Sequence, residues 1–245
     1  IPKIIHQIWL GPKKPPQWCI DSWKINYINK NPEWLYKLWT EKEIEKLGLI
    51  NKDIYNKEPT YRGKSDIARY EILFREGGIF LDADSLWINN KSLNSIFDEI
   101  NQKQENINNN NTSIKNNNII QDNKDILFGA NEPTVHKNLI ANGVIGCNKN
   151  NKIMYSLINN LKLTYSANKS KYNKDHQIWL VTGPIPFNEI LKPFKESNSV
   201  NLCIFPSHYF FPEKFVNGNI QMTKEEIERK FPNSFMYQYW LSHYK

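Results

Sequence analysis

The chain of 245 residues contains little cysteine, and its cysteines are widely spaced. Cys19, Cys147 and Cys203 form no C-x-x-C pair, so no disulfide framework is indicated, although their number is compatible with a single bridge. Cys147 and Cys203 lie inside apolar runs, which favours buried free thiols over redox or zinc-binding cysteines.

Long apolar runs are also missing. No segment approaches the ~20 apolar residues that a transmembrane helix needs, and no signal peptide is visible. The sequence begins at Ile1 without a methionine, which is typical of an excerpt from a longer protein. We therefore expect membrane association only through segments outside this chain, and the sequence leaves the compartment open.

Arginine is scarce as well. The net charge of +7 comes mainly from lysines scattered along the chain, and the arginines are Arg62, Arg69, Arg75 and Arg229. Recognition of bases and phosphates prefers the bidentate fork of arginine, and no basic run occurs. This pattern argues against a nucleic-acid partner. It indicates a solvated surface that attracts anions weakly, a nucleotide diphosphate among them.

Strand and helix patterns alternate along the chain without an internal repeat, which predicts one layered α/β domain over residues 1–245. Apolar alternation and turn residues predict strands at residues 3–9, 34–39, 79–81, 126–128, 143–147 and 201–205. Helical spacing and capping signals predict helices at residues 16–30, 40–47, 61–76, 151–165 and 184–191, and a late helix capped at Thr223.

The composition changes abruptly at residues 101–124, which consist mainly of Asn, Gln, Lys and Ile. Such a tract buries too little apolar area to order itself. We expect it to be an unstructured surface insertion, and we assign it no function.

The strongest local signal is an acidic turn behind a buried strand. Gly77 and Gly78 end the helix at residues 61–76, and the apolar strand at 79–81 leads straight into Asp82 and Asp84. The carboxyl ends of strands are where α/β folds bind ligands. Two carboxylates this close repel each other unless a cation lies between them, and Mn²⁺ or Mg²⁺ can bridge carboxylates to a diphosphate. A solvated acidic turn is the alternative, but the preceding strand and glycine pair favour a metal site.

A second polar group lies on the helix at residues 61–76. Asp66 and Arg69 are three residues apart and share a face, as do Arg62 and Asp66 at four apart. One interpretation is a surface ion pair worth less than ~1 kcal/mol. The other is that this face lies opposite the acidic turn across a sugar. Asp66 would then accept from sugar hydroxyls, and Arg69 would meet a hydroxyl or phosphate oxygen.

Four ordered motifs resemble glycosyltransferase family 32, which includes outer-chain mannosyltransferases and capsular-polysaccharide enzymes. They are IPKIIHQIWLG at residues 1–11, SDIARY at 65–70, GGIFLDAD at 77–84 and TGP at 182–184. The chain is similar, more distantly, to the large glucosylating toxins. The resemblance implies a GT-A-type fold with a mixed central sheet flanked by helices. It also implies retaining, divalent-metal-dependent transfer from a nucleotide-sugar donor, with a UDP-sugar favoured, to a glycan, protein or lipid acceptor.

The resemblance also assigns roles to residues. By analogy Trp9 stacks on the nucleotide base, although core packing of this ring is an alternative, and His6 lines the nucleotide pocket or packs between strands. Asn142 falls where the family often has a site asparagine. The expected donor-binding residues are His6, Trp9, Ser65, Asp66, Arg69, Asp82 and Asn142, and the expected catalytic residues are Asp66, Arg69, Asp82 and Asp84.

The expected metal ligands are Asp82, Asp84 and His243. Asp84, further from the strand, is expected to bind the cation directly, and Asp82 to lie closer to the ribose and donor sugar. The family usually ends in two histidines, a Trp and a Ser-Trp pair that help to close the metal site. This chain keeps Trp240 but has Gln238 and Tyr239 at the histidines, with His243 and Tyr244 at the Ser-Trp pair, so His243 becomes the candidate ligand.

Two other functions remain open. A phosphatase of the haloacid-dehalogenase type also places D-x-D after an apolar strand, with Asp82 as nucleophile and Asp84 as general acid. That class needs a later acidic pair, and its Gly-Asp-x-x-x-Asp pattern is absent. An inactive sugar-nucleotide-binding protein is the second alternative, which the altered tail favours.

Overall fold

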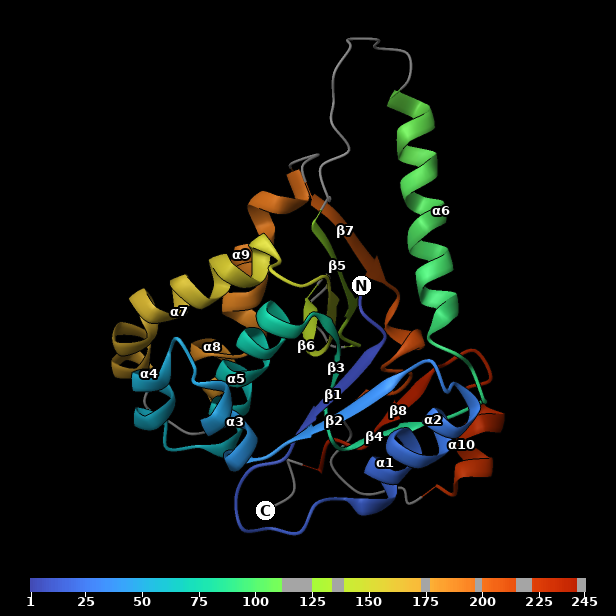
Figure 1. Cartoon of the computed structure of the whole chain (residues 1–245), viewed down its shortest axis with the longest axis horizontal. Helices are drawn as coiled ribbons and strands as arrows, with labels where there is room; N and C mark the ends of the chain where they lie inside the picture. The colour runs from blue at the N-terminus through green and yellow to red at the C-terminus, as the bar shows by residue number, and fades with distance from the viewer. Residues whose placement is uncertain (112–124, 134–138, 173–176, 197–199, 215–221, 242–245) are drawn as a thin grey trace.

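The computed structural model describes residues 1–111, 125–133, 139–172, 177–196, 200–214 and 222–241. Its centre is a six-stranded mixed sheet in the order β2-β1-β3-β6-β5-β7 (Figure 1). The strands are β1 (Ile4–Ile8), β2 (Leu35–Trp39), β3 (Gly78–Leu81), β5 (Asp125–Asn131), β6 (Ile140–Cys147) and β7 (Val200–Phe205). The expected α/β class with a mixed central sheet is thus confirmed.

Strand directions decide which residues meet at each edge of this sheet. Strand β1 runs parallel to both β2 and β3, whereas β6 runs antiparallel to β3 and to β5. The carboxyl ends of β1 and β3 therefore lie at the same edge as the amino end of β6. The segment after Leu81 and the segment around Asn142 become neighbours although they are far apart in sequence.

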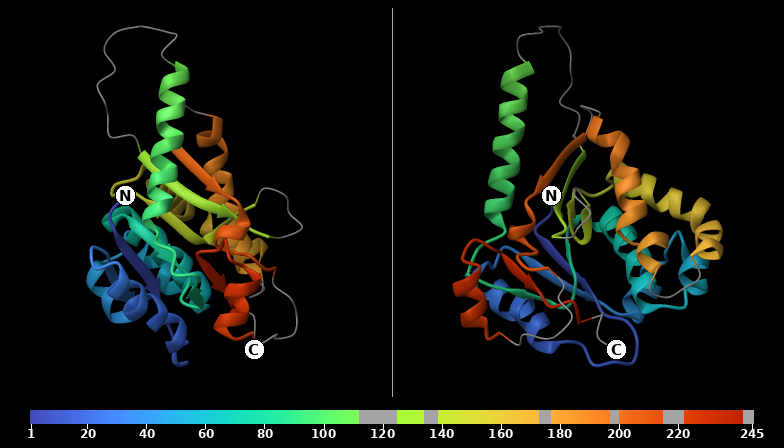
Figure 2. Two further views of the ribbon diagram at one scale, coloured as in Figure 1. Left: turned by 90° about the vertical axis from the view of Figure 1, so that its right-hand side faces the viewer. Right: turned by 180° about the vertical axis from the view of Figure 1, so that it is seen from behind.

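Helices cover both faces of the sheet (Figures 1 and 2). The helices α3 (Glu41–Leu47), α4 (Lys52–Lys57), α5 (Tyr61–Glu76), α7 (Lys152–Lys171), α8 (Ile178–Val181) and α9 (Pro184–Glu196) lie on one side. On the other side lie α1 (Gln17–Asp21), which continues through a π-helical turn (Ser22–Tyr27) into α2 (Ile28–Lys30), and also α6 (Asn94–Asn111) and α10 (Lys224–Lys230). A 3-10 turn spans Ser207–Tyr209.

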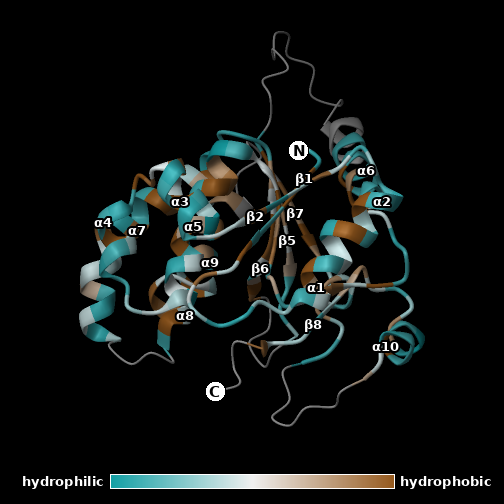
Figure 3. Cartoon of the chain, turned by 60° about the horizontal axis from the view of Figure 1, so that its bottom comes forward, coloured by the Kyte–Doolittle hydropathy of each residue, from teal (hydrophilic) through white to brown (hydrophobic). Residues whose placement is uncertain are grey.

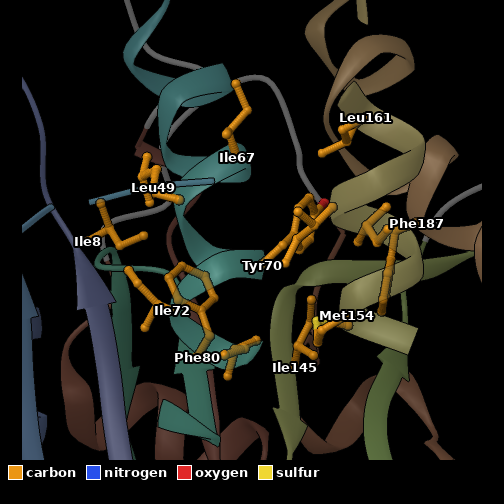
Figure 4. Close-up of a cluster of buried hydrophobic side chains, with 14 of the residues drawn as sticks. Ile8, Leu49, Ile67, Tyr70, Ile72, Phe80, Ile145, Met154, Leu161 and Phe187 are labelled. Atoms are coloured by element: carbon orange, nitrogen blue, oxygen red, sulfur yellow. The ribbon is translucent and has the colours of Figure 1, made fainter. Parts of the chain in front are cut away.

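Two hydrophobic cores form on the two faces because side chains alternate along each strand. Phe80 packs with helices α5, α7 and α9, in the cluster drawn in Figure 4, whereas Ile79 and Leu81 pack with Trp23 and Trp87 on the opposite face. The helices carry both hydrophilic and hydrophobic residues, as amphipathic helices that cover a sheet do (Figure 3). The near-continuous apolar sequence of β3 follows from burial on both faces.

The junction between α5 and β3 has the form that the sequence predicts. Thr60 caps α5 by accepting from the backbone N–H of Gly63, and the helix ends at Gly77 with φ of +66°. Gly78 follows with φ of +91°, and a Cβ there would lie 2.6 Å from the carbonyl oxygen of Ile4. Only glycine combines this backbone conformation with this close approach of β1, so the glycine pair aims β3 into the sheet.

A small second sheet joins the acidic turn to the end of the chain. Strand β4 (Ser85–Trp87) pairs antiparallel with β8 (Met236–Gln238), with Ser85 opposite Gln238. Three-residue strands leave too short a pattern for sequence prediction, and neither was expected. The pairing matters because it fixes the residues immediately after Asp84 against a segment about 150 positions later.

The expectation of an unstructured segment from residue 101 is wrong for its first part. Helix α6 runs on to Asn111, and residues 112–124 lie outside the described part of the chain. The first turns of α6 are packed into the core by Ile96 and Ile100, together with Leu93 just before the helix. Once a packed turn has formed, each further residue adds a hydrogen bond at little cost, so a polar sequence can extend the helix into solvent.

Two further expectations concern single features. Cys19, Cys147 and Cys203 are free and buried, as predicted. Across the described ranges, no helix is both long enough and apolar enough to cross a membrane.

Candidate active site

Polar residues gather where β1 and β3 end and β6 begins. The backbone N–H of Asp82 donates to the carbonyl of Gly143 at 3.0 Å, which holds the acidic turn against β6. Helix α5 lies over this edge and contributes Asp66 and Arg69. The structure therefore brings together Asp66, Arg69, Asp82 and Asn142, as the sequence analysis expected.

Arg69 is the centre of this group. Its Nη1 lies 3.2 Å from Asp82 Oδ1, and its Nη2 lies 3.2 Å from Asp66 Oδ1. Nη1 also donates to the carbonyl of Asn142 at 2.7 Å, and the remaining contacts go to Ser65. Arg69 is 6% exposed, and its guanidinium lies over the Phe80 ring. Because its donors face protein groups, Arg69 acts here as a positioning residue between α5, β6 and the acidic turn.

The surface-ion-pair interpretation of Asp66 and Arg69 is thereby wrong. The Asp66 side chain is 9% exposed, and both of its oxygens accept hydrogen bonds: Oδ1 from Asn142 at 2.9 Å and Oδ2 from the Thr182 hydroxyl at 3.0 Å. Burial raises the pKa of Asp66, while the Arg69 charge acts in the opposite direction. A carboxylate so fully engaged is held in one orientation.

Tyr70 and Thr182 complete this network, and sequence reasoning did not assign them roles. The Tyr70 hydroxyl accepts from Asn142 Nδ2 at 2.9 Å and donates to the carbonyl of Thr182 at 2.9 Å. Both belong to the motifs around residues 65–70 and 182–184, which was the available signal. The two motifs occur together because their side chains share one hydrogen-bond network around Asp66.

Asp82 has a more open position than Asp66. Its side chain is 28% exposed. Its Oδ2 lies against Gly143 on the facing strand, where a Cβ would lie 2.5 Å from that oxygen. Burial raises the pKa of Asp82 to about 6, with the Arg69 charge lowering it and the nearby Asp84 charge raising it. Asp82 is thus the group in this network that can both change its charge near neutral pH and reach a ligand.

Hydrogen bonds from the side chains of Gln7 and Ser85 fix the backbone of the acidic turn. Gln7 Nε2 donates to the carbonyl of Asp82 at 3.1 Å, and Gln7 Oε1 accepts from the Tyr36 hydroxyl at 2.7 Å. The Ser85 hydroxyl donates to the same Asp82 carbonyl at 2.7 Å. Gln7 has no exposed surface. It supports the site without lining it, a role that the first motif alone did not reveal.

Asp84 contacts residues 238–241, at the end of β8 and directly after it. Gln238 Nε2 donates to Asp84 Oδ1, and the backbone N–H of Leu241 donates to Oδ2 at 2.7 Å. The backbone N–H of Tyr239 donates to the Asp84 carbonyl at 3.1 Å. Trp240 between them has φ of +55°, an uncommon backbone conformation for a bulky residue. Residues 238–241 are therefore folded around the Asp84 carboxylate.

Two expected donor residues take different positions. Trp9 follows β1 at the same edge of the sheet as Asp82. It is half-buried and belongs to none of the hydrophobic clusters of the described residues. Its indole N–H donates to the Lys13 carbonyl at 2.7 Å. His6 has no exposed surface: Trp39 donates to its Nδ1 at 3.0 Å, and its Nε2 lies 2.9 Å from the Gly77 carbonyl. Both ring nitrogens are occupied, so the pocket-lining role of His6 is corrected to strand packing. Burial lowers the pKa of His6 to about 4, and the ring is neutral.

The donor set around Asp84 suits a hard divalent cation. The third expected ligand, His243, lies outside the described residues. Within the described chain no group of three His, Cys, Asp or Glu side chains is arranged to hold a metal. The oxygen atoms here are those of the Asp82 and Asp84 carboxylates and the amide oxygen of Gln238, which is buried and has no hydrogen-bond partner. Mg²⁺ and Mn²⁺ accept such oxygen ligands, and Mg²⁺ usually keeps further positions for water and substrate phosphate.

Comparisons with known proteins agree with this geometry. Residues 16–106 match the family described as "Glycosyltransferase sugar-binding region containing DXD motif", which covers α5 and the acidic turn but not Trp9, Asn142 or the tail. Inositol phosphoceramide mannosyltransferase 3 of Schizosaccharomyces pombe is 36% identical over 90 residues, 34% of this chain and 24% of that protein. An uncharacterized glycosyltransferase of Acanthamoeba polyphaga mimivirus is 35% identical over 100 residues, 37% of this chain and 38% of that protein. The chain thus spans well under half the length of these relatives.

Solved structures are similar in fold. PaToxG glycosyltransferase superimposes with a TM-score of 0.52 at 18% identity, over 79% of this chain and 70% of that one. The ligand-free glycosyltransferase domain of the YGT toxin superimposes with a TM-score of 0.51 at 11% identity, over 83% of this chain and 79% of that one. The expected glycosyltransferase A-type fold is therefore confirmed.

The raised pKa of Asp82 predicts a specific pH dependence of stability in the metal-free protein. Between its ordinary pKa of 3.8 and about 6, the folded state holds more protons on Asp82 than the unfolded chain does. The contribution of this group to the free energy of unfolding therefore falls as pH rises through that window, by up to about 3 kcal/mol. Denaturant unfolding of wild type and Asp82→Asn in EDTA at pH 4 and pH 6.5 measures this. The variant should gain stability relative to wild type at the higher pH, and an equal difference at both pH values would contradict it.

Proposed function

We propose that the protein transfers a sugar from a nucleotide-sugar donor to an acceptor. The match of residues 16–106 to the DXD-containing sugar-binding region of glycosyltransferases supports this proposal. The transfer uses a divalent cation, Mn²⁺ or Mg²⁺. The observation that carries the proposal is the pairing of Arg69 with both Asp66 and Asp82 beside the enclosed carboxylate of Asp84. This arrangement provides separate groups for a sugar and for a cation at one edge of the sheet.

The two acidic residues of the turn take different tasks. The charge of Asp82 is already opposed by Arg69 at 3.2 Å, whereas Asp84 is oriented by the tail. Asp84 is therefore the direct cation ligand, and Asp82 turns its exposed edge toward the ribose and the donor sugar. When bound, the cation neutralises the charge that develops on the departing nucleotide diphosphate.

Asp66 and Asn142 orient the sugar side of the site. Their hydrogen bonds to each other and to Thr182 fix both side chains before a donor arrives. Such preorganisation holds the hydrogen-bonding atoms of these side chains in place, so no free energy is spent on reorienting them during the reaction. Arg69 contributes indirectly, because its charge opposes the effect of burial on the pKa of Asp66 and of Asp82.

The stereochemistry is proposed from the family resemblance together with the same contacts. The resemblance to family 32 implies retention, which requires either a protein nucleophile or attack by the acceptor on the face that the nucleotide leaves. Both oxygens of Asp66 accept hydrogen bonds, and Asp82 is paired with Arg69, so neither is a free nucleophile. We favour same-face attack by the acceptor.

Donor and acceptor are proposed by chemical class. The donor is a nucleotide sugar, with a UDP-sugar favoured, and its base stacks on Trp9 at the open end of β1. The acceptor is a glycan, a protein or a lipid; the name of the yeast relative makes inositol phosphoceramide the first lipid to test.

Two alternatives make different predictions. A phosphatase of the haloacid-dehalogenase type gains no support from the family match or from the fold of the similar structures. An inactive nucleotide-sugar-binding protein fits the same site geometry, and it is distinguished by the absence of donor hydrolysis or transfer in the presence of Mn²⁺.

Substitutions of the acidic pair test the proposed division of labour. Asp84→Asn keeps the shape of the side chain but removes the charge that holds the cation, so it should abolish Mn²⁺-dependent UDP binding and turnover together. Asp82→Asn should reduce turnover more strongly than Mn²⁺ binding. Calorimetry of UDP binding with Mn²⁺ or EDTA, together with a donor-hydrolysis assay, measures both. Nucleotide affinity that is unchanged in EDTA would count against the metal-dependent mechanism, and Mn²⁺-dependent binding retained by Asp84→Asn would refute the role of Asp84.

The base-stacking role of Trp9 is tested separately. Trp9→Ala should weaken UDP binding by about 1–3 kcal/mol, the scale of base–aromatic stacking. Trp18→Ala is the matched control, since Trp18 is 48% exposed and has no proposed contact with the nucleotide. Calorimetry at fixed Mn²⁺ provides the comparison. Equal affinities for wild type and a folded Trp9→Ala variant would exclude stacking.

A further inference from the structure

Gln238 has an arrangement that protein contacts alone do not explain. The residue ends β8 directly opposite Ser85, so its side chain lies beside the acidic turn, and it is 4% exposed. Its Nε2 donates to Asp84 Oδ1, but its Oε1 is enclosed and has no hydrogen-bond partner. Buried polar atoms in folded proteins are nearly always hydrogen-bonded, so this amide oxygen points to a missing ligand.

We propose that Gln238 is a cation ligand, and that its amide oxygen joins the carboxylate of Asp84 in holding the divalent ion. The inference rests on the proposed function, because it needs a cation at Asp84. Amide carbonyl oxygens are ordinary ligands for hard divalent ions. One carboxylate and one neutral oxygen leave the remaining positions for the diphosphate of the donor and for water.

The amide can make this change at little cost. The terminal torsion of a glutamine is broad and roughly two-fold, so half a turn exchanges Oε1 and Nε2. The turn breaks one hydrogen bond, that from Nε2 to Asp84 Oδ1, and it moves Nε2 to the enclosed place that Oε1 held, so the number of enclosed amide atoms without a partner does not rise. A cation on Asp84 replaces that bond with a stronger interaction. In the metal-free protein the Nε2 of the same amide donates a hydrogen bond to the carboxylate.

The surrounding structure holds Gln238 in position for this role. The β4–β8 pairing fixes its backbone next to the turn, and the Tyr239 N–H donates to the Asp84 carbonyl at 3.1 Å. The Leu241 N–H donates to Asp84 Oδ2 at 2.7 Å, so Gln238 and Leu241 contact the two oxygens of the same carboxylate. The Gln238 amide and the Asp84 carboxylate are therefore in contact before any ion arrives.

A neutral oxygen ligand predicts a definite metal preference. Carboxylate and carbonyl oxygens suit Mg²⁺ and Mn²⁺, whereas an imidazole at the same place suits Zn²⁺ and other later transition metals. Replacing Gln238 by histidine should therefore change which metal binds best, and not only how tightly one metal binds. A residue that only orients Asp84 through a hydrogen bond would have no such effect on metal preference.

The test measures metal affinity directly. Binding of Mn²⁺ in the presence of UDP is followed by the electron paramagnetic resonance signal of unbound Mn²⁺, with UDP alone as the blank, and Zn²⁺ is measured by competition. Gln238→Leu should weaken Mn²⁺ binding at least tenfold, since losing even a residue that only orients a metal ligand costs about ten- to a hundredfold. Gln238→His should raise the ratio of Zn²⁺ to Mn²⁺ affinity at least tenfold. Gln17→Leu makes the same chemical change at an exposed position and should leave both affinities unchanged.

Each outcome decides a different question. If wild type binds Mn²⁺ and Gln238→Leu binds it equally well, the ligand role is refuted and the proposed function stands. If both Gln238 variants weaken Mn²⁺ binding but the metal ratio of Gln238→His is unchanged, Gln238 is only a positioning residue and the ligand role is again refuted. If wild type itself binds no Mn²⁺, the metal-dependent function fails and this inference fails with it. Should Gln238→Leu not fold, Gln238→His alone decides the matter through the metal ratio.

Discussion

One buried positive charge organises the candidate site. Arg69 is almost fully enclosed, and a charge in such a place is tolerated only when opposite charges and hydrogen bonds surround it. Asp66 on its own helix, Asp82 from the acidic turn and the Asn142 carbonyl from β6 provide these partners. The same requirement ties three distant segments together. A change at any of them leaves another group buried without its partner.

The architecture around Arg69 follows from the need to bring these segments to one edge. The antiparallel direction of β6 brings Asn142 and Gly143 beside Asp82, which parallel neighbours alone would not do. Gly78 allows β3 to pass close to β1, and Gly143 leaves space for the Asp82 carboxylate. The second sheet, β4–β8, then adds the tail around Asp84. The sugar side and the cation side of the site thus rest on two different sheets.

Local patterns in the sequence predicted much of this. The acidic turn comes directly after helix α5, the glycine pair and the buried strand, so the pattern of each element supports the prediction of the next. The capping boxes at Thr40 and Thr223 begin helices as expected. The ends of α5 match because capping and glycine termination are local effects. His6 was harder, because a histidine in a strand can face a pocket or a neighbouring strand, and only the Trp39 and Gly77 contacts decide between them.

The remaining parts depend on contacts that no local pattern records. Thr182 meets Asp66 across 116 positions, and Gln238 meets Asp84 across 154. The tail could be compared with the family's histidines by position, but its folding around Asp84 depends on the short β4–β8 pairing. The Asn-rich segment was misjudged for the opposite reason, since its composition is polar while the turns before it are anchored in the core.

The central claim is that the charge of Arg69 lowers the pKa of Asp82 against the effect of burial. The most direct measurement is the carboxyl ¹³C titration of Asp82 by NMR in metal-free wild type and in Arg69→Met. The account predicts a pKa of about 6 in wild type and a higher pKa in the variant, because burial then acts on Asp82 without the opposing charge. The same Asp82 pKa in both folded proteins would contradict it.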